Sequence, residues 1–334
     1  MEQLDRTASS QTSGTDLWYG LFAVFVCLSC MAAPLRAQDG HIGAPVESST
    51  RTTLSGTVHP KVTPQNEIGL ADPARRLDYV SLLLKKTPAQ QNALERLLEQ
   101  QLDSSSPNYH RWLTPEGYAD RFGVSLNDLA KIAAWLGTQG FKIEATARGR
   151  DWIAFSGTVS QAAAAFHTEF HRYRVDGEDH FGNATELVVP ESLANFIEGI
   201  RGFNDFLPRR IGKLPASLPQ FTNGNGTHAL VPDDLAAIYN ISPLYRAGFD
   251  GTGQRLAVVG QSAIVLSDIR QFRATFGLSS RDPEIWPIGS PGITTDQSEA
   301  NLDVEWSGAV ARNATIVYDY ATSVYSAVQD VIDN

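Results

Sequence analysis

Cysteine is scarce in this sequence of 334 residues, and the only two, Cys27 and Cys30, lie in one apolar run at residues 17–35. An apolar run with small residues near its end, here Ala37, is typical of a secretory signal, although little positive charge precedes it. If residues 1–37 are removed, the remaining protein has no cysteine. Disulfides and thiolate metal sites are then excluded, and stability depends on the core.

Two other fates of residues 17–35 remain open. A run of about 19 uncharged residues can nearly span a bilayer, so this segment is alternatively a retained membrane anchor. A lipid attached to Cys27 or Cys30 is the third option. We therefore expect a secreted or extracytoplasmic protein, in contact with a membrane only if this segment is retained.

Clustered basic charge is also lacking, because 27 Lys and Arg stand against 37 Asp and Glu, a formal net charge of -10. Binding to nucleic acid depends on clustered Lys and Arg that displace counterions from phosphates. Nucleic acid is therefore excluded as an expected partner.

Residues 38–58 are rich in Ser, Thr and Gly without apolar periodicity, which predicts a flexible leader. Residues 59–206 then alternate strand-like runs with amphipathic helices, including helix starts at Thr114 and Ser125 and a left-handed stop at Gly140. This pattern predicts a small α+β sandwich. Its expected strands are at residues 79–85, 141–148, 152–157, near 173 and at 187–189, and its expected helices at residues 88–102, from 115, 126–139, 160–170 and 191–199.

Residues 207–229 contain three prolines, the pair Arg209-Arg210 and the run Asn-Gly-Asn-Gly at 223–226. Such a stretch sustains neither a helix nor a sheet, so it predicts an exposed linker that is open to proteolysis. We place the domain boundary and an activation cleavage there.

Residues 230–334 have the texture of an α/β protein. Apolar strands of the buried parallel type are expected at 255–261 and 314–320, with a helix at 267–276. Alternation of this kind predicts a parallel sheet covered on both faces. Because the chain ends at Asn334 within the next expected helix, we expect this sheet to be truncated.

Glu299 and Asp303 are the candidate catalytic residues. They lie four residues apart in an expected helix, so their carboxylates share one face. Two like charges this close disfavour joint ionisation, which suits a general base oriented by a second carboxyl group. Acids at this spacing are more often solvated surface, but the many apolar residues of this helix favour burial. Glu305 and Asp296 are expected to be structural or solvent-exposed.

The helix that carries E-x-x-x-D resembles the catalytic helix of the sedolisin family of serine-carboxyl peptidases, of the kumamolisin type. The resemblance covers about residues 57–334, with several motifs in the family's order. They are SPNYHRWLTP at 106–115, RFG at 121–123, FSGT at 155–158, AFHT at 165–168, LAAIYNI at 235–241 and PLY at 243–245.

This resemblance implies a ferredoxin-like activation domain at 59–206, followed by the N-terminal part of a subtilisin-like catalytic domain at 230–334. It gives Glu299 the role of general base for a serine and Asp303 that of orienting Glu299. The serine, in a Gly-Thr-Ser context, and an oxyanion-hole aspartic acid have no match after Asp303. The family's calcium site is expected beyond this chain, so no metal ligand is assigned here.

Histidine is missing from the last third of the chain, where His228 is the final one. A Ser-His-Asp triad in residues 230–334 therefore lacks its histidine, and a carboxylate is the local candidate base. With a reference pKa of about 4.3 against about 6.5 for histidine, a glutamate remains a base in acid, which predicts an acidic working pH. Earlier histidines, at 110, 167, 171 and 180, are ordinary surface residues or, alternatively, loosen the propeptide when protonated.

The leading hypothesis is a secreted, self-activating zymogen of a serine-type endopeptidase, whose propeptide binds its own catalytic domain and whose substrates are proteins or peptides. The chain as given is expected to be inactive alone. One alternative is a non-catalytic, propeptide-like inhibitor or binding protein. Another is an inactive gene fragment whose incomplete sheet leaves apolar faces exposed.

Overall fold

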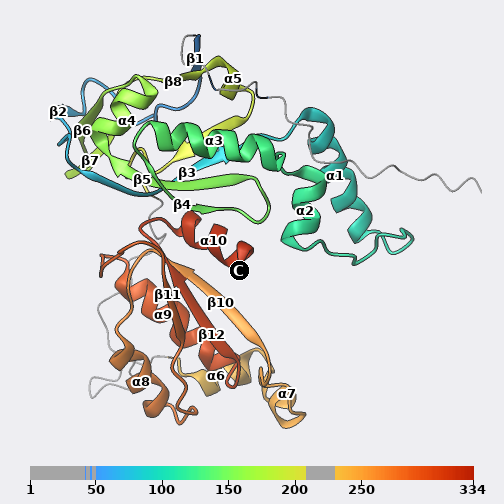
Figure 1. Ribbon diagram of the computed structural model, residues 1–334. Helices are drawn as coiled ribbons and strands as arrows, with labels where there is room; N and C mark the ends of the chain where they lie inside the picture. The colour runs from blue at the N-terminus through green and yellow to red at the C-terminus, as the bar shows by residue number, and fades with distance from the viewer. Residues whose placement is uncertain (1–41, 43–45, 47–49, 208–229) are drawn as a thin grey trace, which may run out of the picture. The chain divides into compact units, whose positions relative to one another are not determined.

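The computed structural model describes residues 42, 46, 50–207 and 230–334 (Figure 1). The expected signal or anchor at 17–35, both cysteines and nearly all of the expected linker lie outside these residues. Within the described ranges, no helix is both long enough and apolar enough to cross a membrane.

Residues 50–207, here called the first part, combine helices with antiparallel sheets (Figure 1). The strands are β1 (Arg51–Leu54), β2 (Glu67–Leu70), β3 (Arg76–Leu84), β4 (Lys142–Thr146), β5 (Trp152–Thr158), β6 (Phe170–Val175), β7 (Glu178–Asn183), β8 (Leu187–Pro190) and β9 (Ile197–Arg201). The helices are α1 (Pro88–Leu102), α2 (Pro115–Phe122), α3 (Leu126–Thr138), α4 (Val159–Phe166) and α5 (Glu191–Ala194).

The longer helices of the first part begin at side-chain caps. Hydroxyl groups of Thr87, Thr114, Ser125 and Thr158 each accept a hydrogen bond from the third amide of α1, α2, α3 and α4. In α1 and α4 the third residue is a glutamine that completes a capping box. Such caps satisfy amides that the helix leaves free, and the sequence predicted the ones at Thr114 and Ser125.

The central sheet of the first part has the order β4-β5-β3-β9, with every neighbouring pair antiparallel. Smaller sheets pair β2-β6-β7 and β1-β8. Helices α3 and α4 pack against this central sheet, and one continuous apolar core lies between the layers. Its fully buried members include Leu82, Ile132, Leu136, Ile153 and Phe155.

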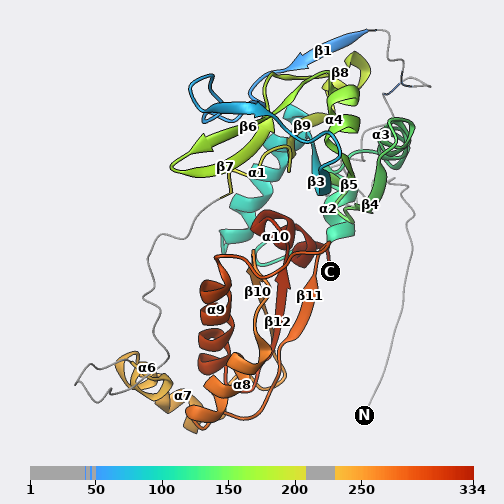
Figure 2. The ribbon, with the colours of Figure 1, turned by 90° about the vertical axis from the view of Figure 1, so that its left-hand side faces the viewer.

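Residues 230–334, the second part, form a three-stranded parallel sheet with the order β10-β12-β11. The strands are β10 (Arg255–Gly260), β11 (Glu284–Pro287) and β12 (Thr315–Tyr320), and the helices are α6 (Pro232–Ile238), α7 (Ser242–Arg246), α8 (Leu266–Thr275), α9 (Gln297–Val310) and α10 (Val324–Asp333). The rotated view in Figure 2 shows α9 running alongside this sheet. The observed α/β alternation and the parallel pairing agree with the sequence prediction.

Some local predictions were wrong. The helix expected at 191–199 ends after one turn at Ala194, and residues 197–201 form β9, because Ile197 and Ile200 complete the edge of the central sheet. Strands β2, β7 and β11 were not expected, and β1 lies within the expected flexible leader, where it pairs with β8. Leu98 and Leu102 of the amphipathic helix predicted at 88–102 are exposed.

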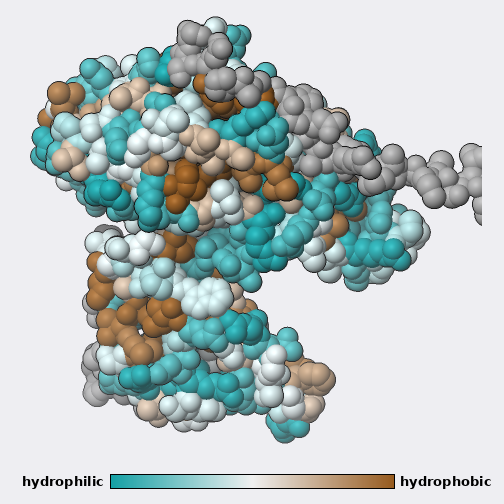
Figure 3. Space-filling view, viewed as in Figure 1, coloured by the Kyte–Doolittle hydropathy of each residue, from teal (hydrophilic) through white to brown (hydrophobic). Residues whose placement is uncertain are grey.

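The prediction of a buried strand at 255–261 was also wrong in part. The first half of β10, at Arg255, Leu256 and Ala257, is exposed. The physical reason is that β10 lies at the sheet edge and pairs with β12 alone among the described strands. Apolar side chains also gather on the surface over β11 and α9 (Figure 3). Exposed Ile285 belongs to β11, and exposed Ile293 to the loop between β11 and α9.

Candidate active site

Helix α9 carries the two candidate catalytic residues. Ala300, Val304, Gly308 and Ala309 are buried along this helix, which packs against β10 and β12. Small residues allow the helix to approach the sheet closely, and the spacing of four puts them on one stripe. Glu299 and Asp303 lie beside this stripe and are half-buried, so neither is a fully solvated surface acid.

The two carboxyl groups act on one another electrostatically. Burial, followed by the negative charge of Glu299, raises the pKa of Asp303 above its ordinary value. A like charge at one helical turn produces this effect because it disfavours ionisation of its neighbour. The raised pKa favours the protonated form of Asp303, and the catalytic roles of the two acids remain predictions.

The start of α9 is held at the carboxyl end of β10 by Gln261 and Ser262. The side-chain nitrogen of Gln261 donates to the Asp296 carboxylate at the N-terminus of α9 (3.2 Å). The side-chain oxygen of Gln261 accepts from the backbone amide of Val324 at the start of α10 (3.3 Å). The Ser262 hydroxyl accepts from the amide of Thr294 (3.0 Å). Glu299 therefore lies one turn from an anchored helix start, at the edge of the sheet where parallel α/β proteins place their sites.

Asn301, between the two acids in sequence, fixes the rotation of α9. Its side-chain oxygen accepts from the backbone amide of Val265 (3.2 Å), and its side-chain nitrogen donates to Asp268 of α8 (3.1 Å). These two bonds tie α9 to α8 and to the loop after β10. Because a helix moves as a rigid unit over a turn, they also set the directions in which Glu299 and Asp303 point.

Tyr318 of β12 holds the loop after β10 through a hydrogen bond to Ser262. Its side chain is fully buried, and its hydroxyl group donates to the carbonyl oxygen of Ser262 (2.7 Å). The tyrosine oxygen lies where a side chain at position 260 would begin, since a Cβ added to Gly260 would come within 2.0 Å of it. Glycine at position 260 is therefore required by this packing.

Glu305 is a third acid of α9, for which the sequence predicts a structural or solvent-exposed position. It is half-buried on α9, and burial, with the charge of Asp268 on α8, raises its pKa to about 7. Its electrostatic neighbour, Asp268, thus differs from that of Asp303, which is Glu299. Its position between buried Val304 and half-buried Trp306 was the available signal of its burial.

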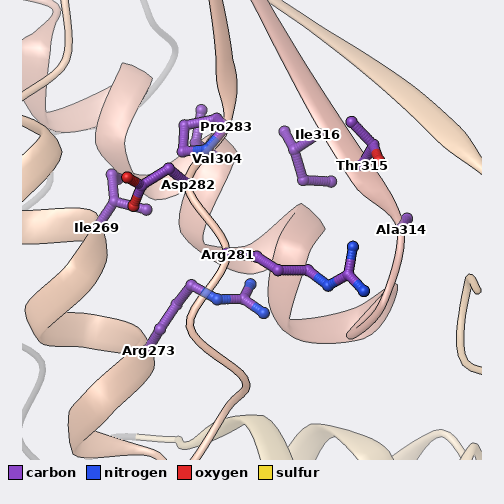
Figure 4. Close-up of a pocket in the computed structure, with 9 residues that line it drawn as sticks. All are labelled: Ile269, Arg273, Arg281, Asp282, Pro283, Val304, Ala314, Thr315 and Ile316. Atoms are coloured by element: carbon purple, nitrogen blue, oxygen red, sulfur yellow. The ribbon is translucent and has the colours of Figure 1, made fainter.

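A cavity near the end of α9 lies away from the two acids (Figure 4). It is lined by Val304 and by Ala314–Ile316 at the start of β12, and the side chains of Arg273 and Arg281 extend into it. Arg273 is buried, and it donates to the backbone oxygens of Ser279, Gly308 and Arg312. The bonds to Gly308 and Arg312 satisfy carbonyl groups at the C-terminal end of α9, and the bond to Ser279 ties Arg273 to the chain after α8, so Arg273 has a structural role.

The described residues contain no cluster of three or more His, Cys, Asp or Glu side chains that could hold a metal ion. The calcium site that the resemblance implies was expected beyond this chain, and that expectation stays a prediction.

Two of the histidines in the first part have acidic partners. The imidazole of His171 lies 2.7 Å from Glu67 and 3.2 Å from Glu169, and that of His180 lies 3.3 Å from Asp205. The hypothesis that histidine protonation releases the propeptide remains a prediction.

Comparison with known proteins agrees with this architecture. Residues 65–206 match the family described as Pro-kumamolisin, activation domain. The chain is similar to xanthomonalisin from Xanthomonas sp. (strain T-22), with 26% identity over 276 residues that cover 78% of this chain and 32% of the relative. It is similar to kumamolisin from Bacillus sp. (strain MN-32), with 24% identity over 244 residues, 68% of this chain and 43% of the relative.

Human tripeptidyl-peptidase 1 is a third relative, with 28% identity over 312 residues that cover 90% of this chain and 50% of the relative. The chain thus spans about a third to a half of the length of the curated relatives that it matches.

Proposed function

We infer that this chain, a member of the sedolisin family whose residues 65–206 match the pro-kumamolisin activation domain, belongs to the zymogen of a serine-carboxyl endopeptidase that works in acid. The observation that carries this proposal is the half-buried pair Glu299 and Asp303 on α9, in which burial and then the charge of Glu299 raise the pKa of Asp303. A family that is named for its peptidases and a carboxylate pair suited to general-base catalysis support the same chemistry.

In the proposed mechanism, Glu299 removes the proton from a serine hydroxyl group, and Asp303 orients Glu299 and donates a hydrogen bond to it. The serine attacks the peptide carbonyl, the amine leaves, and water hydrolyses the acyl-enzyme. The 31 residues from Val304 to Asn334 contain no Gly-Thr-Ser sequence. We therefore propose that the nucleophile and the oxyanion-hole acid belong to a longer reading frame.

The finer fold assignments belong to this proposal. Two strand–helix–strand units with the order β4-β5-β3-β9 support a ferredoxin-like activation domain. The parallel sheet with α8 and α9 supports a subtilisin-like catalytic domain that starts near residue 230. We propose that residues 207–229 are the linker that is cut on activation, and that residues 1–37 direct export or anchor the protein in a membrane.

The test is hydrolysis of acid-denatured protein by two products, the 334-residue chain and the longer reading frame. We expect turnover from the longer product alone, and we expect E299Q and D303N to reduce its kcat by about 10²-fold or more, since general-base catalysis contributes that much. The matched control is Glu305→Gln, which removes a neighbouring acid of the same helix and should reduce kcat far less. Turnover by the 334-residue chain, or full activity of E299Q, would contradict the proposal.

The second candidate, a non-catalytic inhibitor, is favoured by the completeness of the first part, whose core is continuous. It predicts that the purified 334-residue chain inhibits a mature sedolisin-type peptidase and that the reading frame stops after Asn334. Sequencing the transcript beyond this codon distinguishes the two candidates.

A further inference from the structure

A second pair of acids lies outside the proposed active site, between β12 and α10. Along β12, Tyr318 and Tyr320 pack with the core beneath α8 and α9. Because side chains alternate along a strand, Asp319 points to the opposite face of the sheet, where α10 packs. Asp330 of α10 is its neighbour there, and its carboxyl group acts on that of Asp319.

Asp319 is fully buried, with 0% of its surface exposed, and neither of its carboxylate oxygens accepts a hydrogen bond from a donor among the described residues. Most buried polar atoms have such a partner. An ionised carboxylate left in this position would be strongly disfavoured, since burial penalises charge that nothing compensates.

No cationic side chain among the described residues donates a hydrogen bond to Asp319. The residues beside it in the sheet are Val259 of β10 and Trp286 of β11. From α10 it faces Asp330, with Asp333 one turn further, and Asp333 is engaged by the backbone amide of Arg148. Tyr79 of β3 and Glu144 of β4 are further titratable groups in this region. Two arginines also contact α10, since Arg148 donates to the backbone oxygen of Asp333 and Arg201 lies over the ring of Tyr325.

The pKa of Tyr79 is shifted by the same acidic groups. Burial, with the charges of Asp330, Asp319, Asp333 and Glu144, raises the pKa of Tyr79 to about 12, so this phenol stays neutral and supplies no positive charge to the pair. Burial and the adjacent Asp330 likewise raise the pKa of Asp319 far above that of an ordinary aspartate.

We propose that Asp319 and Asp330 bind one proton between them in the folded protein, and that this proton holds α10 against β12. A hydroxyl group on one carboxyl then donates to the other carboxylate, so that both oxygens facing the gap are satisfied with a single negative charge. Two carboxyl groups that share one proton titrate as a unit. The proposal concerns the fold and does not rest on the peptidase function.

The proposal fixes how stability depends on pH. In the unfolded chain each aspartate titrates near about pH 3.9, whereas the folded pair holds its proton to a much higher pH. The stabilisation is therefore complete below the ordinary aspartate pKa and is lost as the pH rises toward and through the raised pKa of the pair. Helix α10 should be docked most firmly in acid and least firmly at mildly alkaline pH.

The test is thermal unfolding of the 334-residue chain and its D319N variant at about pH 5 and about pH 8. Asparagine has the shape of a protonated aspartic acid, and its amide donates to Asp330 at every pH. We expect equal Tm values at the lower pH, and at the higher pH a Tm for D319N that exceeds the wild-type Tm by roughly 3–6 °C. D330N, which keeps the same hydrogen bond from the other partner, should behave in the same way.

Asp282→Asn is the matched control, because Asp282 is an exposed aspartate of the same part whose pKa is lowered by a hydrogen bond from Arg270. It should leave the wild-type loss of Tm between the two pH values in place. The proposal is overturned if D319N and D330N lower Tm equally at both pH values, which would indicate plain packing damage. It is also overturned if they keep the wild-type pH dependence.

Infrared difference spectra provide a second measurement that does not depend on how the variants fold. A carboxylic-acid carbonyl band from the wild type should persist well above the ordinary aspartate pKa and vanish when the pair loses its proton. Absence of this band would refute the shared proton. If calcium chloride at the higher pH raises the wild-type Tm and leaves D319N unchanged, the pair binds a cation instead, and the proposal fails.

Discussion

Asp128 of α3 and Asp319 of β12 are both aspartates with 0% exposure, one in each part of the chain. Asp128 accepts hydrogen bonds from the Ile42 amide (3.1 Å) and the Ser125 hydroxyl group (2.8 Å), whereas Asp319 has no donor among the described residues and faces another acid. The same side chain is thus a fixed structural link in the first part and a proton-binding group in the second. Burial alone does not decide the role of an aspartate; the donors around it do.

The wider architecture repeats this difference. Helices α1 to α4 of the first part have side-chain caps, while α7, α8, α9 and α10 of the second part have none. At the start of α9, the Asp296 side chain accepts from Gln261 and does not cap the helix. The first part also has one large continuous core beside a small cluster around Trp152, whereas the second has two small clusters on opposite faces of its sheet. We therefore expect the first part to be the more stable of the two.

The largest expected effect comes from replacing one leucine in a strand of each part. Leu82 of β3 is fully buried, and Leu256 of β10 is 39% exposed. Leu82→Ala should reduce the free energy of unfolding of the first part by about 2–5 kcal/mol, because it leaves a cavity. Leu256→Ala should cost under about 1 kcal/mol, since much of its side chain already contacts water. Urea titration of both variants checks this, and equal losses would break the comparison.

The next test removes the acceptor at the buried link. Asp128→Ala leaves the donors of Ile42 and Ser125 without their partner, at a cost of about 1–3 kcal/mol. In contrast to D319N, it should destabilise the protein at every pH at which the wild type is folded. Thermal unfolding at the two pH values used for D319N provides the measurement. A gain in stability from Asp128→Ala at mildly alkaline pH would remove the distinction between the two aspartates.

Helix caps allow a smaller test in both directions. Thr114→Ala removes the acceptor for the Gly117 amide and should cost about 1 kcal/mol. Val265→Ser provides a cap at the start of α8, where none exists, and should gain up to about 1 kcal/mol. Denaturant midpoints of the two variants should move in opposite directions. A loss on Val265→Ser would indicate that the bond between its backbone amide and Asn301 was disturbed.

The smallest expected effect concerns the candidate active site. Because the charge of Glu299 contributes to the raised pKa of Asp303, E299Q should lower that pKa toward the ordinary aspartate range. Carboxyl-carbon NMR with labelled aspartate follows this titration, with D303N used to assign the signal. Glu305→Gln is the control, since Glu305 interacts with Asp268 instead. An unchanged titration in E299Q would show that the two acids are not coupled.

Much of the fold could be predicted from local signals. Thr114 and Ser125 mark helix starts, and the limits of α1 match the predicted 88–102, because caps and apolar periodicity depend on neighbouring residues alone. Residues 191–199 were predicted wrongly because pairing with a distant strand, β3, decides their conformation. The exposure of β10 had the same origin, since an apolar run does not reveal whether a strand has one neighbour or two.

The candidate site shows the same limit. The spacing of Glu299 and Asp303 placed them on one face of a helix, and their half-burial agrees with that prediction. The network that anchors α9, with Gln261 and Asn301, could not be predicted, because its partners come from loops more than 30 residues apart in sequence. The sequence also provides no signal for Asp319, which lies in an apolar strand. Only the structure shows that its buried carboxylate lacks a hydrogen-bond donor among the described residues.

The contact between Gly260 and Tyr318 restricts how this region can vary during evolution. An alanine at position 260 would displace the tyrosine ring, whose Cζ atom would lie only 2.8 Å from the new carbon. Tyr318→Phe would thus not rescue it, because removing the hydroxyl group leaves the ring in place. The two positions must change together, with a smaller side chain on β12, and that change would leave the Ser262 carbonyl group without its donor. Each of the two residues therefore opposes substitution of the other during evolution.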